Sequence, residues 1–526
     1  MPPNALPPRA TALLLALAAA LLLFRLGAAP LLGPDEPRYA RVAVEMERSG
    51  AWITPTLAGA PWLEKPPLYY WLAGPAFRLL GETEAAARLP SALAGVALVG
   101  VCALWAARTA GGAAGLAAGF VVATSLLPFV YAHAATMDVL LALLVTASTG
   151  LLGLRYLGIA GPLAVPAAYA FSALAVLAKG ALGLIPGLVA LVYLVATRDW
   201  RRLRESISIP GLALFLAIAL PWHLLAYLRH GQAFVDTYVL NHNLERFTTT
   251  QHHHPGPLWY YGPVIVAGFF PWSGLLLPAL ARLSPRRSAL DSWLLAWFLA
   301  PSLLLSLAGS KLPGYILPVL PPLAVLIGRT CSEMAADRDV VALRQPAAWL
   351  GLALAAMLAA APLVLARSGE PAWRLAVPTA GWALLTGFAF SRQVVRDAIG
   401  ALRLLRIGAA GLMALLALAA PALLAARESG RGLFLPAGGR EVLAWGAWRT
   451  AWMAGYFYND GRVREVSGLA EIEAGLRDEA LLVLCGPAER RRLAATPFQV
   501  RVLAEGPRSN ALLLVAGPAG AGPATR

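Results

Sequence analysis

The chain has 526 residues, of which 59% are hydrophobic and only 13% charged, and a mean hydropathy of +0.65; a soluble domain is nearer half apolar and a quarter charged, so the composition excludes an ordinary soluble protein. The formal net charge of +15 would suit nucleic acid in a soluble chain, but arginines clustered between apolar runs are typical of cytoplasmic loops, so no nucleic-acid partner is expected. The three cysteines, Cys102, Cys331 and Cys485, form neither a disulfide framework nor a zinc pattern.

Runs of about 20 apolar residues recur along the chain, long enough to cross a bilayer as helices and without the alternation of barrel strands. The N-terminal run resembles a signal peptide, but the many later runs favour an uncleaved first span. The apolar run around Lys179 is divided into two spans, and this division has the weakest support in the sequence. We predict thirteen membrane-spanning helices, at residues 10–28, 90–107, 112–132, 136–154, 162–178, 180–197, 208–228, 259–281, 291–309, 313–328, 346–366, 375–390 and 407–426.

The arginines predict the orientation, because cytoplasmic loops are enriched in Lys and Arg. With the N-terminus in the cytoplasm, the clusters at 198–204, 282–287 and 392–406 fall in inner loops, whereas the loop bounded by Arg367 and Arg374 is an exception. An odd number of spans then leaves the tail outside. The sequence therefore predicts a multi-pass membrane protein with a cytoplasmic N-terminus and a C-terminal domain on the outer side.

Three segments are too polar to span the membrane. The outer loop 29–89 contains two predicted helices, over residues 39–48 and 66–80, which we expect to lie in the outer interface where Trp and Tyr are favoured. The second outer loop, 229–258, is rich in His, Asn and Thr. The third segment is the C-terminal tail.

The tail has frequent charges and short apolar runs, which indicate a folded domain outside the membrane. We therefore predict a transmembrane domain over residues 1–426, with the active site in loop 29–89, and a small α/β domain over 427–526. Within the tail we predict strands at 461–466, 481–484 and 512–515, a helix at 469–477 and a disordered end at 516–526.

Ionisable residues are scarce within the predicted spans, although Asp138 and Lys179 lie at span ends. Polar residues instead collect in three outer loops. This convergence favours an enzyme site at the membrane face over a conduit through the membrane, which would place ionisable groups inside it. The candidates are Asp35, Glu36, Arg38, Tyr39, Glu64 and Lys65 in the first loop, His242, Arg246 and His252 to His254 in the second, and Lys311 and Tyr315 in the third.

Asp35 follows Gly33 and Pro34, directly after the first span. A carboxylate there can act as a general base, or hold a cation or a substrate hydroxyl; alternatively it caps the N-terminus of a helix. Arg38 and Tyr39 would share its helix face. A guanidinium binds phosphate bidentately and a phenol adds one bond, but an arginine here also suits simple contact with lipid headgroups.

Two prolines stiffen the sequence after Glu64 and Lys65. Lys65 could reach a phosphate while Glu64 reaches a metal or a hydroxyl; the alternative is a plain turn. His242 and Arg246 are four residues apart and would share a helix face. A histidine with a carboxylate such as Glu64 can hold a divalent cation, whereas the triplet that ends at His254 also fits a solvated loop.

These motifs together resemble the membrane glycosyltransferases of the GT-C fold that use polyprenyl-phosphate sugars, and most of all the lipid A aminoarabinose transferases, which are related to protein O-mannosyltransferases. The resemblance covers about the first 330 residues. Its motifs, in chain order, are Pro34 to Ala40, Leu63 to Pro67, Arg88 to Ser91, Thr136 to Asp138, Lys179-Gly180, Asn241 to Phe247, Pro257 to Tyr261 and Ser310 to Tyr315.

The resemblance implies a role for each site residue. Asp35 is similar to the catalytic carboxylate of the family. Glu64 and His242 resemble a pair that binds a divalent cation such as Zn, Mg or Mn. His242 is alternatively one residue out of register with the family motif, in which case Asn243 stands at the position of the histidine. Residues expected around the donor phosphate are Arg38, Tyr39, Lys65, Arg246 and Tyr315, and those expected along the cavity are Glu36, Asp138, His254 and Lys311.

The implied reaction is an inverting transfer of a pentose or hexose from a polyprenyl phosphate to a lipid A-like lipid, a glycan or a protein, among membrane lipids. The resemblance also implies the location: the outer face of a bacterial inner membrane, with the C-terminal domain in the periplasm. Cations stabilise the departing phosphate, and Asp35 deprotonates or orients the acceptor. The alternatives are a transporter or flippase of similar lipids, and a protein O-glycosyltransferase that uses the same donor class. Fold alone does not identify the acceptor.

Overall fold

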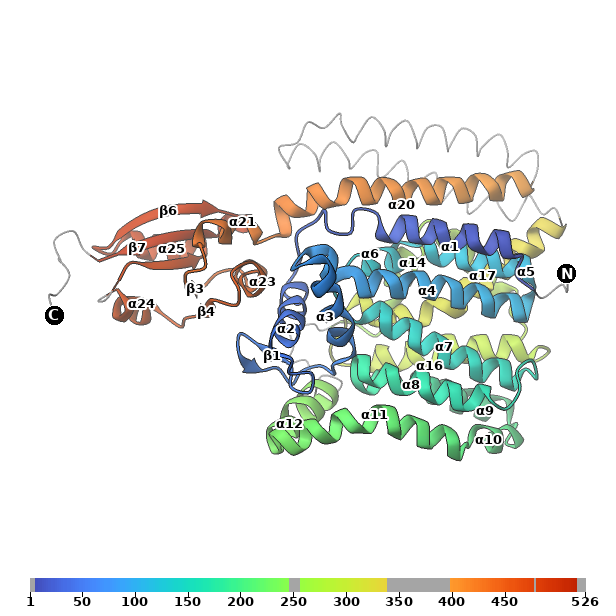
Figure 1. The fold of residues 1–526 in the computed structure, drawn as a ribbon. Helices are drawn as coiled ribbons and strands as arrows, with labels where there is room; N and C mark the ends of the chain where they lie inside the picture. The colour runs from blue at the N-terminus through green and yellow to red at the C-terminus, as the bar shows by residue number, and fades with distance from the viewer. Residues whose placement is uncertain (1–4, 246–255, 338–397, 477–478, 518–526) are drawn as a thin grey trace.

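A computed structural model describes residues 5–245, 256–337, 398–476 and 479–517. A long helical bundle forms most of the molecule, and a smaller body with a β-sheet lies at one end of it (Figure 1). The bundle contains α1 (Pro8–Leu23), α4 (Glu84–Ala110), α5 (Gly112–Ala123), α6 (Leu126–Ala132), α7 (Asp138–Tyr156), α8 (Ala164–Lys179), α9 (Ile185–Thr197), α11 (Ile209–His230), α14 (Tyr261–Gly268), α15 (Leu276–Ala281), α16 (Ala289–Leu307), α17 (Leu320–Asp337) and α20 (Ala398–Glu428).

The prediction of a polytopic helical membrane protein is confirmed. Among the described residues, seven helical stretches are long and apolar enough to cross a membrane, or nine if each of two bent pairs is one span; this count takes α8 and α9 together, residues 164–197, as one stretch. The bent pairs are α5 with α6, at 58°, and α14 with α15, at 110° through the 3-10 turn η3 (Trp272–Leu275). The predicted spans at 346–366 and 375–390 lie outside the described residues.

The chain reverses direction at Lys179, so α8 and α9 form a hairpin. The Ser172 hydroxyl donates to the carbonyl of Gly183 over 2.7 Å, whereas residues eleven apart in one straight helix would be about 16 Å apart. Gly180, at φ +65°, and the 3-10 turn η1 (Gly180–Leu184) make the reversal. The two predicted spans at 162–178 and 180–197 are therefore separate helices.

Local sequence explains several helix starts. Thr83, Ser208 and Ser288 stand before α4, α11 and α16, and each side-chain oxygen accepts a hydrogen bond from a backbone N–H of the first turn. Such N-caps satisfy donors that the helix itself leaves unpaired. Small residues also allow helices to pack closely in the bundle core. A Cβ built on Gly153 would lie 2.4 Å from the indole nitrogen of buried Trp293, so only glycine fits at this contact.

A layer of short elements covers the end of the bundle that faces the sheet body (Figure 1). The predicted helices of loop 29–89 are present as α2 and α3, but α2 is buried along most of its length, from Glu36 to Met46, rather than lying on the membrane surface. The layer comprises α2 (Asp35–Ser49), β1 (Thr56–Leu57), β2 (Ala60–Pro61), α3 (Leu68–Leu80), α12 (Gln232–Phe234), the π-helix η2 (Val235–Glu245) and the 3-10 helix η4 (Pro313–Val319). The short helix α10 (Arg201–Ser206) lies at the opposite end (Figure 1).

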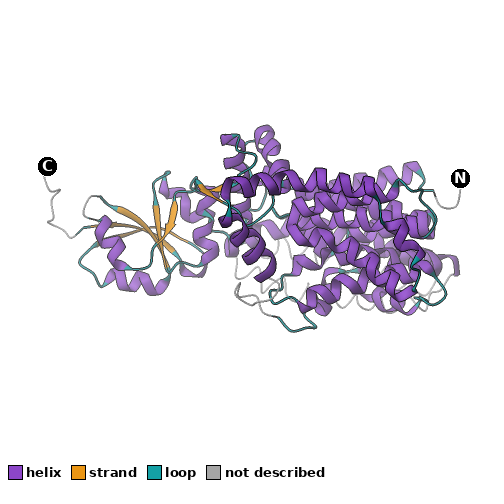
Figure 2. Cartoon of the chain, turned by 90° about the horizontal axis from the view of Figure 1, so that it is seen from below, coloured by secondary structure: helices purple, strands orange, loops and turns teal. Residues whose placement is uncertain are grey.

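The sheet body follows α20 and has five strands in the order β4-β3-β5-β7-β6. Strands β4, β3 and β5 run parallel, and β7 is antiparallel to both β5 and β6. The strands lie among short helices (Figure 2). The elements are α21 (Arg431–Phe434), η6 (Leu435–Ala437), β3 (Val442–Trp445), α22 (Arg449–Met453), α23 (Gly455–Tyr458), β4 (Val463–Glu465), α24 (Leu469–Gly475), β5 (Leu481–Cys485), α25 (Pro487–Ala494), β6 (Gln499–Glu505), η7 (Pro507–Ser509) and β7 (Ala511–Ala516).

The three central strands, β3, β5 and β7, are buried on both faces of the sheet, which explains why they are continuously apolar. Along β5, Leu482 and Leu484 pack on one face with Phe434 and Trp452, while Val483 and Cys485 pack on the other with Ile472. The predicted strands at 461–466, 481–484 and 512–515 and the helix at 469–477 all have counterparts. Ala516 belongs to β7, so the predicted disordered end began too early; residues 518–526 lie outside the described part.

Candidate functional site

Asp35 is the first residue of α2, and its carboxylate forms an ion pair with Arg38 one turn later. The N-cap position is held by Pro34, and no side chain caps this helix, so the capping role considered for Asp35 is wrong. The Asp35 side chain is 41% exposed, whereas that of Arg38 is 11% exposed. The first turn of α2 thus presents an accessible carboxylate fixed by a buried guanidinium.

The Arg38 guanidinium is held from three sides. Its Nε donates to the carbonyl of Pro34 over 2.9 Å, and the group lies 5.3 Å from the ring centroid of Trp62. Burial acts to lower the pKa of Arg38, but the negative charges of Asp35 and Glu64 outweigh it and raise the pKa above its ordinary value. Arg38 is therefore a permanent cation with Glu64 in its electrostatic neighbourhood.

Tyr39 is buried beside Arg38 and contacts Tyr69 and Tyr70, at centroid distances of 6.5 Å and 6.4 Å. Burial, assisted by the charge of Asp35, raises the pKa of Tyr39 well above its ordinary value of 10.0. The phenol therefore stays protonated at any physiological pH and keeps an O–H donor.

Glu36 differs from its neighbour Asp35 because its carboxylate is buried and hydrogen-bonded to other elements of the protein. It is 5% exposed and pairs with the guanidinium of Arg88 in α4, with one contact of 3.0 Å and one of 2.9 Å. It also accepts from the backbone N–H groups of Leu32, over 2.6 Å, and Ala135, over 2.5 Å. Glu36 lines a cavity as predicted, but its contacts assign it to holding α2 against α4. The Arg88 to Ser91 motif supplied its partner, which the sequence alone did not identify.

Two cavities meet at Tyr315. The first, of about 430 Å³, contains Asp35, Glu36, Thr136, Asp138 and Arg25 in its wall, together with apolar residues of α6 and α20; we call it the Asp35 cavity. The second, of about 360 Å³, is lined by Glu64, Lys65, Lys179, His242, Asn243 and Ser310 among others; we call it the Lys65 cavity. Tyr315 lines both.

An ion pair joins the two cavities. Asp138, at the start of α7, lines the first cavity and pairs with Lys179, which lines the second. The Lys179 ammonium lies 4.4 Å from the ring centroid of Tyr315. Each side chain of the pair is about one-tenth exposed. In the sequence, Lys179 stands in a motif and at the end of a predicted span, but nothing there assigns it to the site. Its spacing from Asp138 along the chain carries no signal of the pairing.

Glu64 and His242 are brought together as predicted. A carboxylate oxygen of Glu64 lies 3.7 Å from Nε2 of His242. The neighbouring Asn243 instead donates to the carbonyl of Tyr238 over 2.6 Å and accepts from the N–H of Ala181 over 3.3 Å. His242, and not Asn243, is therefore the residue that faces Glu64.

The Glu64 and His242 pair fits a shared divalent cation. Ligand distances of about 2.0 to 2.2 Å allow two donor atoms of one ion to be up to about 4 Å apart, and these two atoms are 3.7 Å apart. Within the described part of the chain, however, no group of three or more His, Cys, Asp or Glu side chains converges as a metal site. Any further ligand would have to come from another residue type, from water or from substrate.

The remaining predicted residues differ in outcome. Lys311 is buried and its ammonium donates to the carbonyl of Ala308 over 2.6 Å. The walls of the two cavities described above do not include it, and its cavity role stays a prediction. Lys65 is 8% exposed and lines its cavity as expected. Arg246 and His254 lie outside the described residues.

The chain is similar in sequence to several known proteins. A family model described as dolichyl-phosphate-mannose-protein mannosyltransferase matches residues 64–224. An undecaprenyl phosphate-alpha-4-amino-4-deoxy-L-arabinose arabinosyl transferase of Aeromonas salmonicida is 32% identical over 392 residues, which are 70% of this chain and 70% of that protein. The enzyme of the same name from Edwardsiella ictaluri is 34% identical over 305 residues, but the match spans only 54% of that protein and 56% of this chain.

Among solved structures, ArnT from Cupriavidus metallidurans bound to undecaprenyl phosphate superposes with a TM-score of 0.80 at 24% identity, covering 96% of this chain and 99% of that one. The superposition shows that the fold is shared over nearly the whole length. Together with the 32% sequence identity, which extends over 70% of each chain, it shows that the chain belongs to the family of the undecaprenyl phosphate-aminoarabinose arabinosyl transferases, a group of membrane glycosyltransferases.

Proposed function

We propose that this protein transfers a 4-amino-4-deoxy-arabinose unit from undecaprenyl phosphate to a lipid A-type acceptor at the outer face of the inner membrane. The names of the relatives support the donor and the sugar. The observation that carries the proposal is the meeting of two cavities at Tyr315, with the Asp35 carboxylate in one and the Lys65 ammonium in the other. A transfer reaction needs two such compartments, one for each substrate.

The Lys65 cavity suits the donor phosphate. Lys65 is a buried cation in its wall, Lys179 is a second cation, and Ser310 and Tyr315 add hydroxyl groups. As the bond between the anomeric carbon and the phosphate oxygen breaks, negative charge grows on the phosphate, and cations fixed beside it stabilise that charge. Arg38, with its charge enforced by Asp35 and Glu64, adds to the same field.

The Asp35 cavity suits the acceptor. Its wall contains apolar residues of α6 and α20, such as Phe129 and Leu416, and a polar end with Asp35 and Arg25. A lipid with a polar headgroup matches this division. Because the ion pair with Arg38 already fixes the Asp35 carboxylate, we assign Asp35 the role of orienting the attacking oxygen against the anomeric carbon from the face opposite the phosphate, with inversion.

Glu64 and His242 would hold the divalent cation that the family resemblance implies. When bound, such an ion supplies positive charge for the phosphate. The protein residues act without it in the remaining steps: Lys65 binds the leaving phosphate, Tyr39 keeps a neutral O–H donor beside Arg38, and Asp35 orients the acceptor.

The orientation in the membrane is part of the proposal. The N-terminus and the arginine-rich helix α10 lie at one end of the bundle, and the candidate site and the sheet body lie at the other (Figure 1). The positive-inside bias supports a cytoplasmic position for the first end. We accordingly assign residues 1–426 to the catalytic membrane domain and 427–526 to an outer domain. A cysteine at Ser467 should react with a membrane-impermeant reagent in intact spheroplasts; protection until lysis would reverse the orientation.

The family model gives one specific reason to consider a protein acceptor, since its description is that of a protein mannosyltransferase. Purified protein should be incubated with a panel of polyprenyl-phosphate sugars, each with lipid A or an unstructured Ser/Thr-rich peptide, and the products identified by mass spectrometry. We expect an added pentose amine on lipid A. A sugar on the peptide alone would replace the acceptor, and no release of polyprenyl phosphate from any donor would contradict the proposed activity.

A further inference from the structure

The sheet body contacts the active-site layer through α23 and the turn that follows it, residues 455–461. The Tyr458 hydroxyl accepts a hydrogen bond from the N–H of Leu31 over 2.6 Å and donates to Glu84 over 3.0 Å. The ring of Phe457 lies 6.3 Å from that of Phe77 in α3. Leu31 lies four residues before Asp35, so residues 455–461 hold the loop that leads into α2.

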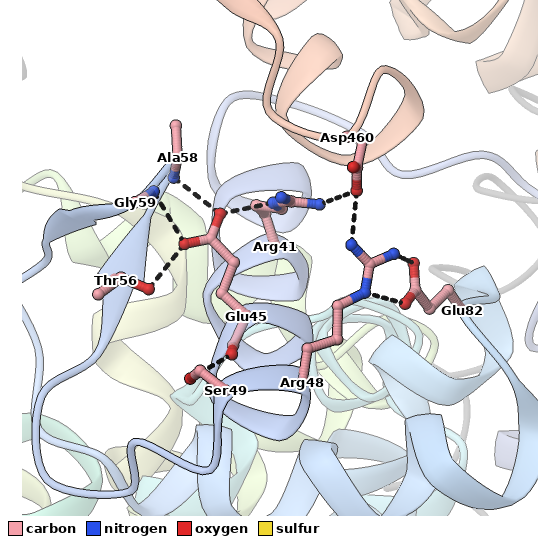
Figure 3. A network of polar contacts seen from close by, with 9 residues as sticks. All are labelled: Arg41, Glu45, Arg48, Ser49, Thr56, Ala58, Gly59, Glu82 and Asp460. Carbon is pink, nitrogen blue, oxygen red and sulfur yellow. Dashed lines mark hydrogen bonds and ion pairs between the residues drawn. The ribbon is translucent and has the colours of Figure 1, made fainter. Parts of the chain in front are cut away.

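Asp460 continues the contact along α2 (Figure 3). Its carboxylate forms ion pairs with two arginines of that helix, Arg41 and Arg48, the latter over 2.8 Å. Each arginine also has a carboxylate of its own: Arg41 pairs with Glu45 over 2.6 Å, and Arg48 pairs with Glu82 over 2.7 Å. Asp460 is thus a carboxylate that joins two otherwise complete ion pairs across the boundary between the two bodies.

The inner pair is anchored to the rest of loop 29–89. Arg41 and Glu45 are each only 10% exposed, and Glu45 accepts from the Thr56 hydroxyl over 2.7 Å and from the N–H of Ala58 over 2.8 Å (Figure 3). A helix transmits displacement along its length as a rigid rod, and Arg41 lies one turn after Arg38. The position of Asp460 therefore affects the position of the turn that carries Asp35 and Arg38.

We propose that Asp460 is a positioning residue for the transferase, which fixes α2 from the sheet body and so sets the geometry of Asp35 and Arg38 at the cavity. The inference rests on the proposed function. The sheet body would then affect turnover through the ion pairs of Asp460 with α2. Asp460 itself would not touch substrate. A shift of about 1 Å in a reacting group can cost up to about a hundredfold in rate.

The test is Asp460→Asn in the full-length protein, with donor turnover, donor KM and thermal unfolding measured together. Because Arg41 and Arg48 each keep a carboxylate, the substitution leaves no unpaired buried charge, and we expect the unfolding midpoint to stay close to that of the wild type. The expected result is a fall in kcat of about tenfold with a smaller change in KM, the signature of lost alignment.

The matched control is Glu505→Gln. Glu505 is also an exposed carboxylate of the sheet body in an ion pair, with Arg490 over 2.5 Å, but it does not touch α2. We expect wild-type kcat for this control. Equal kcat in Asp460→Asn and Glu505→Gln, in a preparation where the wild type turns over, would overturn the inference while leaving the proposed function intact. A wild type without turnover on any donor would instead contradict the proposed function.

A covalent tether gives an independent arm if the exchange of charge disturbs folding. A Cβ built on Gly461 would lie 3.5 Å from the Cβ of Ala58, within the range that a disulfide joins, and the three native cysteines are buried. Gly461 has φ +77° and the added Cβ would lie 3.3 Å from Nε of Arg41, so the cysteines strain this turn, and the reduced form of the same protein, which carries the same strain, is the reference. In a protein carrying Asp460→Asn with Ala58→Cys and Gly461→Cys, oxidation should raise kcat above that of the same protein reduced. No gain after verified cross-linking would count against a positioning role.

Discussion

At the scale of single residues, two adjacent carboxylates have different tasks. Asp35 is part-exposed, lines a cavity and pairs with Arg38, whereas Glu36 is enclosed by Arg88 and two backbone N–H groups. Sequence spacing placed both in the same loop and could not separate them. The separation depends on which face of the first turn of α2 points toward α4, and that is a matter of tertiary packing.

Glu36→Gln should therefore destabilise the protein. The amide cannot replace the ionic contacts to Arg88, and breaking one partner of a buried ion pair costs about 3–5 kcal/mol. We expect a lower thermal unfolding midpoint and poor recovery from the membrane. Asp35→Asn is the natural comparison, because the Asp35 side chain is 41% exposed and Arg38 keeps the carbonyl of Pro34 and the charge of Glu64, so we expect a clearly smaller fall in the midpoint. Similar midpoints for both variants would show that Glu36 is not a structural anchor.

At the scale of elements, the hairpin of α8 and α9 places Lys179 at the cavity. The turn η1 folds back so closely that a Cβ on Gly183 would lie 2.3 Å from the backbone nitrogen of Val176. Backbone approach of this kind needs a residue without a side chain. Periodicity predicted two spans here, but the 3-10 reversal and the pairing of Lys179 with Asp138 could not be predicted from it.

Gly183→Ala should consequently perturb the hairpin by overpacking, at a cost of about 1–3 kcal/mol, and lower turnover by displacing Lys179. Gly187→Ala, four residues on in α9, has no atom within 4 Å of the added Cβ and should be neutral or slightly stabilising. Thermal unfolding of both variants, with turnover at a temperature where each is folded, checks the contrast. A neutral Gly183→Ala would mean that the close approach of η1 to α8 is not maintained.

Much of the element pattern was available from the sequence, for physical reasons. Long apolar runs have few alternatives to membrane helices, and the apolar strands β5 and β7 read clearly because both faces of the sheet are buried. The strands β3 and β6 were not predicted: β3 has only four residues, and β6 is largely exposed and charged. The π-helix η2, which presents His242 to Glu64, has no simple periodic signature.

At the scale of the whole molecule, the contact between the bundle and the sheet body was invisible in the sequence. It joins Arg41 to Asp460 across 419 positions of the chain, and neither residue stands in a motif of its own. The sequence located both bodies and most of the cavity residues, because loop motifs concentrate there. It could not show that the second body rests on the catalytic helix, since a charge on a turn is far more often merely solvated.

This contact predicts a defined response to acid. Burial acts to raise the pKa of Asp460 and of Glu45, but hydrogen bonds from arginines, and for Glu45 first from Thr56 and Gly59, lower both below their ordinary values of 3.8 and 4.5. A lowered folded-state pKa contributes stability that is present above the ordinary value and is lost as the pH falls through the folded value. The network should therefore be intact from pH 5 upward and weaken only below about pH 4.

The check is the thermal unfolding midpoint of wild type and Asp460→Asn between pH 7 and pH 3. We expect the two curves to run in parallel above pH 5 and the wild type to fall more steeply below pH 4, because only it has the Asp460 carboxylate to protonate. Glu505→Gln, which leaves the network in place, should follow the wild type. A difference in slope that appears already between pH 7 and pH 5 would contradict this assignment.

The most direct test of the account is a single-turnover measurement of polyprenyl phosphate released from undecaprenyl phosphate-aminoarabinose, with lipid A present, by purified wild type and Asp35→Asn. We predict release by the wild type and at least about a hundredfold slower release by the variant, since an orienting group that acts in the transition state is lost, with both proteins measured at a temperature where thermal unfolding shows them to be folded. Equal release by the two proteins would contradict the assignment of the Asp35 cavity as the site of transfer.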